Sequence, residues 1–173
     1  VITPILYAYN IDRQLTRITR PDGQRVDVGY DSAGRQNAVT ISRGTTTYAY
    51  DPTTGNPATI SAPGGISLAY TFDGALWTGA TWTGPVTGSV NRAYDNNLRV
   101  ISTSVNGGPA VTFQYDQDNL LTQAGVLTLT YQAQTGLLTG SVLGSVTDTI
   151  GYNGFAEALT YTAAYNGTSL YTV

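Results

Sequence analysis

The chain has 173 residues with no cysteine and no histidine; its eight basic residues are all arginine, and its formal net charge is −3. This composition excludes disulfide bonds, the usual Cys–His and Ser–His catalytic pairs and most zinc sites, and it offers no basic cluster for nucleic acid. Charged residues make up 11% of the chain, against roughly 25% in an average soluble domain, so the surface must consist largely of Thr, Ser, Gly, Asn and Gln.

From the N-terminus onward, short segments with apolar or threonine residues at alternate positions predict β-strands with one buried face. Each such strand ends at a tyrosine, and a polar turn follows, most completely at residues 31–35 and 51–55. A second β-rich run and a looser loop with Gly, Pro or Asn complete a two-stranded hairpin. The strands before the turn are expected at 26–30, 46–50, 66–70, 111–115 and 127–131, the strands after it at 38–41, 98–101 and 120–122, and the loops at 21–23, 62–65 and 106–109.

The hairpins recur at a nearly fixed period. The steps between successive tyrosines are 21, 20, 20, 24, 21, 16 and 21 residues. A period of this length indicates one small structural unit stacked many times. Residues 1–173 are therefore expected to form a single all-β array of about eight stacked antiparallel hairpins with no separate domain. The repeat tyrosines are Tyr9, Tyr30, Tyr50, Tyr70, Tyr94, Tyr115, Tyr131 and Tyr152.

The Tyr-Asp-x-x-Gly-Arg pattern at residues 30–35, its relatives at the other tyrosines and the Pro-x-Gly loop at 21–23 resemble the YD repeats of the RHS family. The resemblance covers residues 7–152. It implies a spiralling β-sheet that forms the solenoid-like wall of a hollow tube or shell, as in bacterial polymorphic toxins, insecticidal toxin complexes and teneurins. Besides the tyrosines, the structural repeat residues are Asp31, Gly34, Arg35, Asp51, Gly55, Asp95 and Asp116.

In toxin members of that family the shell encloses a C-terminal effector, so a toxin cargo is a candidate partner. Those members also cleave themselves at an aspartate in an Asp-Pro-x-Gly context. Here Asp51-Pro52 is followed by Thr53-Thr54. Self-cleavage is therefore not transferred to this chain.

The remaining acidic residues give little sign of chemistry. The repeat aspartates are expected to cap backbone amides in turns, because a glycosidase needs two acids that face each other. An EF-hand calcium loop that starts at Asp116 would need Gly at Leu121 and Glu at Leu127. The sequence predicts no enzyme, no catalytic residues, no cofactor and no metal site.

The tyrosines and tryptophans allow two interpretations. The repeat tyrosines occupy the apolar phase of their strands, which favours a cross-strand aromatic ladder that joins one repeat to the next. The alternative is an adhesin-like module in which Trp77 and Trp82, inside the 24-residue step, contact a glycan, or in which the turns at Arg13, Arg35 and Arg99 hold a surface.

The leading functional prediction is a structural β-repeat module of an extracellular or cell-surface assembly, secreted and bacterial in origin. Residues 1–7 and 169–173 both read as uncapped strands. We therefore expect other YD repeats as partners, in the same longer chain or in identical subunits that add end to end as a filament or tube. No apolar run approaches the length of a membrane span.

Overall fold

The computed structural model describes residues 4–173, which form seventeen β-strands and, over that range, no helix. Each strand pairs with its neighbours in antiparallel orientation, so the predicted all-β array of hairpins is confirmed. The first strand begins at Leu6; residues 1–3 of the strand expected at 1–7 lie outside the described residues. Nothing in residues 4–173 forms an apolar helix of membrane-spanning length.

The strands are β1 (Leu6–Tyr9), β2 (Leu15–Thr19), β3 (Arg25–Tyr30), β4 (Gln36–Ile41), β5 (Gly44–Tyr50), β6 (Pro57–Ala62), β7 (Ile66–Asp73), β8 (Leu76–Thr83), β9 (Gly88–Tyr94), β10 (Val100–Val105), β11 (Val111–Tyr115), β12 (Leu121–Ala124), β13 (Leu127–Tyr131), β14 (Leu138–Leu143), β15 (Val146–Tyr152), β16 (Ala158–Tyr165) and β17 (Thr168–Thr172).

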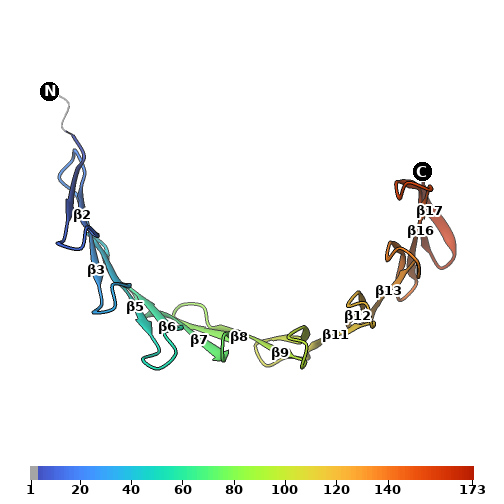
Figure 1. The fold of residues 1–173 in the computed structure, drawn as a ribbon, viewed down its shortest axis with the longest axis horizontal. Helices are drawn as coiled ribbons and strands as arrows, with labels where there is room; N and C mark the ends of the chain where they lie inside the picture. Colours follow the sequence, from blue (N-terminus) through green and yellow to red (C-terminus); the bar gives the residue numbers. More distant parts are fainter. Residues whose placement is uncertain (1–3) are drawn as a thin grey trace. The chain divides into compact units, whose positions relative to one another are not determined.

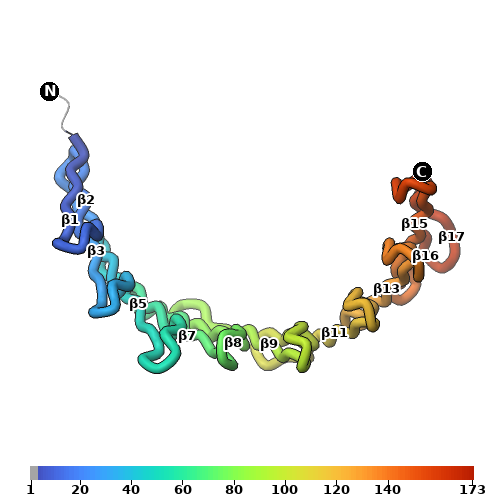
Figure 2. The backbone as a smooth tube through the Cα atoms, viewed as in Figure 1, coloured from blue at the N-terminus to red at the C-terminus, as the bar shows by residue number. Residues whose placement is uncertain are grey.

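The chain divides into two compact units, Val1–Asn91 with Val105–Gly107 and Arg92–Ser104 with Gly108–Val173. In the first unit, consecutive strands pair from β1 to β9, and they follow one another in chain order from blue to green in Figure 1. In the second unit, consecutive strands pair from β10 to β17. The backbone trace shows the same hairpin repeated within each unit (Figure 2).

The strand register separates apolar from polar side chains. Residues that face each other on neighbouring strands lie on the same side of the sheet. In the first unit one such row is Tyr48, Ile60, Leu68 and Trp82, whereas the row beside it, on the opposite face, is Thr47, Ser61, Ser67 and Thr83. The second unit repeats this division, with the rows Leu127, Leu143, Val146, Tyr165 and Thr130, Gly140, Thr149, Thr162.

Each unit is one layer of strands. Among the described residues the only buried hydrophobic side chain is that of Ala80, at 9% exposure. The repeat tyrosines Tyr30, Tyr50 and Tyr115 are half-buried. Because no second layer packs on the sheet within a unit, stability must come from contacts between neighbouring strands and repeats rather than from an enclosed core.

A β-bulge marks the end of the first strand of most hairpins. The register shifts immediately before Tyr9, Tyr30, Tyr50, Tyr115, Tyr131 and Tyr152. In the fourth hairpin the shift lies between Thr71 and Phe72. Phe72-Asp73 therefore stands where the sequence suggested Tyr70-Thr71, and the interval is 22 residues both from Tyr50 to Phe72 and from Phe72 to Tyr94. The apparent 24-residue step contains no insertion.

Candidate functional site: the junction between repeats

The aspartate of each YD motif closes its own turn. Asp31 Oδ1 accepts hydrogen bonds from the backbone amides of Ala33 and Arg35, both at 2.9 Å. Asp95 and Asp116 accept the same pair of bonds from their own turns, and Asp51 accepts bonds from the amides of Thr53 and Thr54. The aspartates therefore act as caps of backbone amides, as expected for turn residues.

An asparagine makes the same cap in the last repeat. Asn153 Oδ1 accepts from the amides of Phe155 and Glu157 at 2.9 and 3.0 Å, while its Nδ2 donates to Glu157 Oε2 at 2.6 Å. The cap therefore requires an oxygen acceptor and not a negative charge.

These hydrogen bonds lower the pKa of three of the carboxyl groups. The main cause is the backbone amide of Arg35 for Asp31, that of Arg99 for Asp95, and that of Thr54 for Asp51. Burial opposes the shift in each case. The three groups are thus held in the ionised form, which is the form that accepts these bonds best.

The arginine of the motif connects two repeats. Arg35 Nε donates to Asp31 Oδ2 at 2.8 Å within its own turn, and its guanidinium carbon lies 4.2 Å from the centre of the Tyr50 ring in the next repeat. Arg99 does the same, with Nε 2.8 Å from Asp95 Oδ2 and the guanidinium carbon 4.7 Å from the Tyr115 ring centre. Each arginine thus makes an ion pair backward and a cation–π contact forward.

The tyrosine hydroxyl makes the return contact. Tyr50 Oη donates to the carbonyl of Gln36 at 2.9 Å, and Gln36 is the first residue of the preceding strand β4. The same geometry joins Tyr30 to Leu15, Tyr115 to Val100, Tyr131 to Leu121 and Tyr152 to Leu138, at 2.8 to 2.9 Å. In all five cases the acceptor is the first residue of the preceding strand.

The residue that follows each turn also reaches the next turn. Gln14 Nε2 donates to the Gly34 carbonyl at 2.9 Å, Arg35 Nη1 lies 3.5 Å from the Gly55 carbonyl, and Asn56 Nδ2 donates to the Gly74 carbonyl at 2.8 Å. Four successive turns are therefore linked by three side chain-to-backbone contacts. In the second unit the equivalent residue Leu120 lies against Gly136 of the next turn, which replaces the hydrogen bond with an apolar contact.

The turn residue just before this position has a positive φ. Gly34 and Gly55 have φ of 78° and 77°, which glycine adopts without steric cost. Arg13, Leu98, Asn119 and Ala156 take the same backbone conformation with φ between 61° and 66°. The turn thus requires a left-handed backbone conformation at this position. Glycine adopts it freely, whereas the non-glycine residues of four repeats adopt it with some backbone strain.

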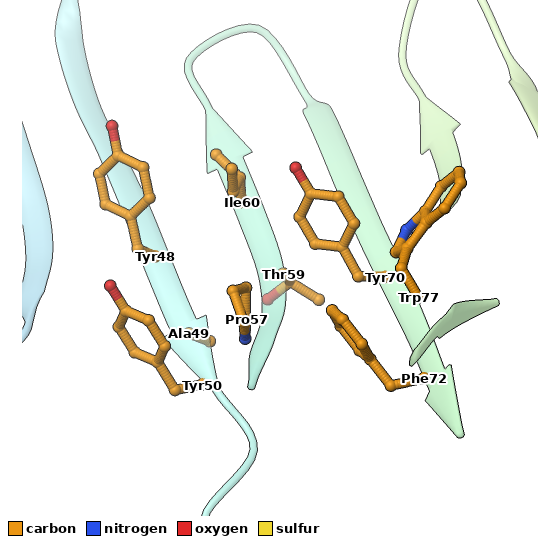
Figure 3. Close-up of a pocket in the computed structure, with 9 residues that line it drawn as sticks. All are labelled: Tyr48, Ala49, Tyr50, Pro57, Thr59, Ile60, Tyr70, Phe72 and Trp77. Atoms are coloured by element: carbon orange, nitrogen blue, oxygen red, sulfur yellow. The ribbon is translucent and has the colours of Figure 1, made fainter. Parts of the chain in front are cut away.

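The two candidate ligand-contact tryptophans differ in their surroundings. Trp82 faces Gly88 across β8 and β9, and a Cβ at Gly88 would overlap the indole ring, so this ring covers the glycine backbone. Trp77 lines an open apolar hollow of about 360 Å³ together with Tyr48, Tyr50, Tyr70, Phe72 and Ile60 (Figure 3). Tyr48 and Tyr70 stand on either side of Ile60, and Trp77 lies beside Tyr70.

Sequence reasoning missed Phe72 and Asn56 as repeat residues. The signal for Phe72 was the string Phe72-Asp73-Gly74, an aromatic residue followed by Asp and Gly, which the tyrosine two residues earlier obscured. The signal for Asn56 was its place directly after Gly55, as Arg35 follows Gly34. Within residues 4–173 no group of three or more His, Cys, Asp or Glu side chains is arranged to bind a metal ion.

Solved structures show the same fold. The TcdB2-TccC3 structure without its hypervariable C-terminal region superposes with a TM-score of 0.60 at 16% identity, covering 97% of this chain and 9% of that chain. The Photorhabdus luminescens Tc holotoxin pore with a mutated TccC3 gives a TM-score of 0.61 at 17% identity, with the same coverage of 97% and 9%. This chain thus spans less than a tenth of the length of either.

No curated protein sequence matches the chain. The family described as Teneurin YD-shell matches residues 2–173. The contacts of the tyrosine, aspartate and arginine side chains give a physical reason why these residue types recur in the repeat. The resemblance to YD repeats is confirmed, and the chain belongs to the Teneurin YD-shell family.

Proposed function

We propose that this chain forms part of the wall of a protein shell and that its repeat residues hold neighbouring hairpins in register instead of catalysing a reaction. Membership of the Teneurin YD-shell family and the likeness to the Tc toxin structures support a structural role. The proposal extends to closure of the sheet as a tube or shell.

The contact between an arginine and the tyrosine of the next repeat carries this proposal. Arg35 and Tyr50, and again Arg99 and Tyr115, join hairpins through a cation–π contact and a tyrosine hydrogen bond. In an enzyme, polar side chains from separate elements converge on one pocket. Here the capping side chain recurs from turn to turn and the tyrosine hydrogen bond joins five pairs of neighbouring strands, an arrangement that favours a structural wall over a single active site.

The same comparison supports a proposal for the partners and the location. One related structure is a Tc holotoxin pore, and another is named for a hypervariable C-terminal region that it lacks. We propose further YD repeats as the neighbours of this segment, in the same longer chain or in identical subunits, within an extracellular assembly that encloses a toxin cargo.

The glycan-binding alternative has weaker support. A sugar-binding platform needs exposed aromatic faces, whereas Trp82 is occupied by its contact with Gly88. A glycan role would therefore depend on Trp77 and the tyrosines beside it.

Electron cryomicroscopy of the native protein that contains this chain tests the shell proposal. We expect residues 6–172 to lie in a wall one sheet thick around an enclosed volume. A globular particle in which another domain packs over the apolar face would overturn the proposal, and particles built of many copies would identify identical subunits as the partners. A glycan-array screen of wild type and Trp77→Ala tests the glycan-binding alternative. Specific binding by wild type that is lost in Trp77→Ala would favour that alternative.

A further inference from the structure

The junction at Asn56 lacks the arginine that the junctions at Arg35 and Arg99 contain. Asn56 occupies the position of Arg35, because both follow a left-handed glycine and both reach the carbonyl of the glycine in the next turn. Their backbone carbonyls also accept the equivalent hydrogen bond, from Asp51 N in one turn and from Asp31 N in the other, at 2.8 Å each. Asparagine is much shorter than arginine, so it leaves the volume beyond its amide unfilled.

The groups that hold the arginine elsewhere are still present around that volume. A hollow of about 190 Å³ lies between Asp51, Asn56, Tyr70 and Phe72. Asp51 corresponds to Asp31, which pairs with Arg35, and Phe72 corresponds to Tyr50, on which Arg35 stacks. The hollow therefore has an aspartate and an aromatic ring in its lining, the two kinds of group that hold the arginines elsewhere.

One oxygen of the Asp51 carboxylate is available to accept a hydrogen bond from a ligand. Its three hydrogen bonds, from the amides of Thr53 and Thr54 and from the Thr54 hydroxyl, all end on Oδ1. Oδ2 receives no hydrogen bond from residues 4–173, whereas Asp31 Oδ2 and Asp95 Oδ2 receive Nε of their arginines. The lowered pKa of Asp51, caused first by the Thr54 amide, keeps this oxygen negatively charged near neutral pH.

The larger apolar hollow adjoins the smaller one. Pro57, Tyr70 and Phe72 line both, and the larger hollow extends over Ile60 to Tyr48 and Trp77 (Figure 3). A cationic group beside Asp51 would thus have an apolar hollow of about 360 Å³ next to it for an attached hydrocarbon chain. An alkylguanidinium has the matching combination of groups: a planar charged head for the carboxylate and an apolar stem for the hollow.

We propose that the junction between Asp51 and Phe72 is a binding site for a guanidinium group carried by another molecule, either a small alkylguanidinium or an arginine side chain of a polypeptide. The guanidinium donates to Asp51 Oδ2 and stacks on the Phe72 ring, while its stem lies towards Tyr70 and Ile60. It takes the place that Arg35 and Arg99 fill from within the chain.

The test is a titration of the chain, followed by the amide signals of Asp73 and Gly74 and by Trp77 fluorescence, with three guanidinium probes. The probes are propylguanidinium, N-acetyl-arginine amide and the peptide acetyl-Gly-Ser-Arg-Ser-Gly amide. N-acetyl-citrulline amide is the control, because citrulline has the shape of arginine without its charge. We expect binding at about millimolar concentrations, as for exposed charged and cation–π contacts, and at least roughly ten-fold weaker binding of the citrulline control.

The three probes distinguish the sources of the guanidinium. Tighter binding of the peptide than of propylguanidinium would identify a polypeptide arginine as the ligand, and the reverse order would identify a small molecule. Either order supports the site. Equal affinity for arginine and citrulline would overturn the proposal, because it would show binding without recognition of the charge.

Two variants locate the site. Asn56→Arg places an arginine in the vacant volume, so it should abolish probe binding and raise the melting temperature. Asp51→Asn keeps the turn, since Asn153 makes the same cap, and should weaken binding about three-fold or more. Unchanged affinity in a folded Asn56→Arg variant would overturn the proposal. Arg43→Lys, a change at an exposed turn residue of another hairpin, is the matched control and should bind like wild type.

Discussion

The guanidinium of Arg35 lies over the ring of Tyr50, and the hydroxyl of Tyr50 returns to the carbonyl of the residue that follows that arginine. The two contacts are made on opposite parts of one tyrosine: its face and its tip. They fix both the distance and the register between two consecutive hairpins. The same pair of contacts joins Arg99, Tyr115 and Val100 in the second unit.

Loss of the arginine should weaken the junction through the tyrosine ring. We expect Arg35→Ala to lower the free energy of unfolding by about 1 kcal/mol, and a double-mutant cycle with Tyr50→Leu to give a coupling of about 0.5–1 kcal/mol. Urea denaturation measures both. Arg43→Ala, at an exposed turn position, should change stability by less than about 0.5 kcal/mol. Zero coupling would show that the stacked geometry contributes nothing.

The tyrosine hydroxyl should contribute separately from the ring. Tyr50→Phe removes one hydrogen bond and leaves the Gln36 carbonyl without that donor, so we expect a loss of about 1 kcal/mol. Tyr48→Phe is the control, because the Tyr48 hydroxyl makes no hydrogen bond within residues 4–173.

The converse change lies in the next repeat. Phe72→Tyr adds a hydroxyl at the position from which the other tyrosines donate to the first residue of the preceding strand, here Pro57. Stability measured in urea should rise by up to about 1 kcal/mol. If Phe72→Tyr destabilises the chain while Tyr50→Phe does so too, Phe72 is not equivalent to the repeat tyrosines.

Acid should loosen the turns. The pKa values of Asp31, Asp51 and Asp95 are lower in the folded chain than in the unfolded one, where an aspartate titrates near about 3.9. Their contribution to stability is complete above that value and is lost as the pH falls through the folded pKa values. Melting temperatures measured from pH 7 down to pH 2 should therefore drop most steeply below about pH 4.

A triple variant with asparagine at these three positions is the matched comparison, because Asn153 shows that asparagine can make the cap. We expect its melting temperature to depend less on pH over the same range. An unchanged acid slope would assign the effect to other carboxylates.

The left-handed turn residues should respond to glycine. Leu98 has φ of 63° and is 64% exposed, so Leu98→Gly relieves backbone strain and removes little packing. We expect a gain of about 1 kcal/mol, measured as a rise in melting temperature. Ala156→Gly should behave alike, whereas Gly34→Ala should destabilise, since its φ is 78° and a Cβ would crowd Gln14. A lower melting temperature in both Leu98→Gly and Ala156→Gly would contradict the strain argument.

Much of the fold could be predicted because period-two alternation fixes the face of each side chain. Tyr48, Ile60 and Leu68 lie on one face as the alternation requires. The position of Phe72 could not be read from the spacing of tyrosines, because the bulge that sets the register falls two residues after Tyr70. The interaction between Arg35 and Tyr50 was also out of reach, since it depends on which residues of adjacent hairpins come opposite each other.

The aromatic ladder predicted from the tyrosines takes a mixed form. Between Tyr48 and Trp82 the row passes through Ile60 and Leu68, so two aliphatic side chains separate the two rings. Ring pairs do occur, at 6.5 Å between the centroids of Tyr70 and Phe72 and at 6.2 Å for Tyr161 and Tyr171. Within each unit the apolar row nevertheless lies on one face of the sheet.

The hydroxyl contacts also bear on how such proteins change length. Each of the five tyrosine hydroxyls donates to the strand immediately before its own, and the acceptor lies 10 to 15 positions earlier in the chain. Excision of one whole period would bring an equivalent donor opposite an equivalent acceptor, whereas removal of half a period would leave both without a match. Gene duplication and loss in steps of one hairpin therefore preserve every surviving joint, which makes the number of repeats a freely adjustable quantity in evolution.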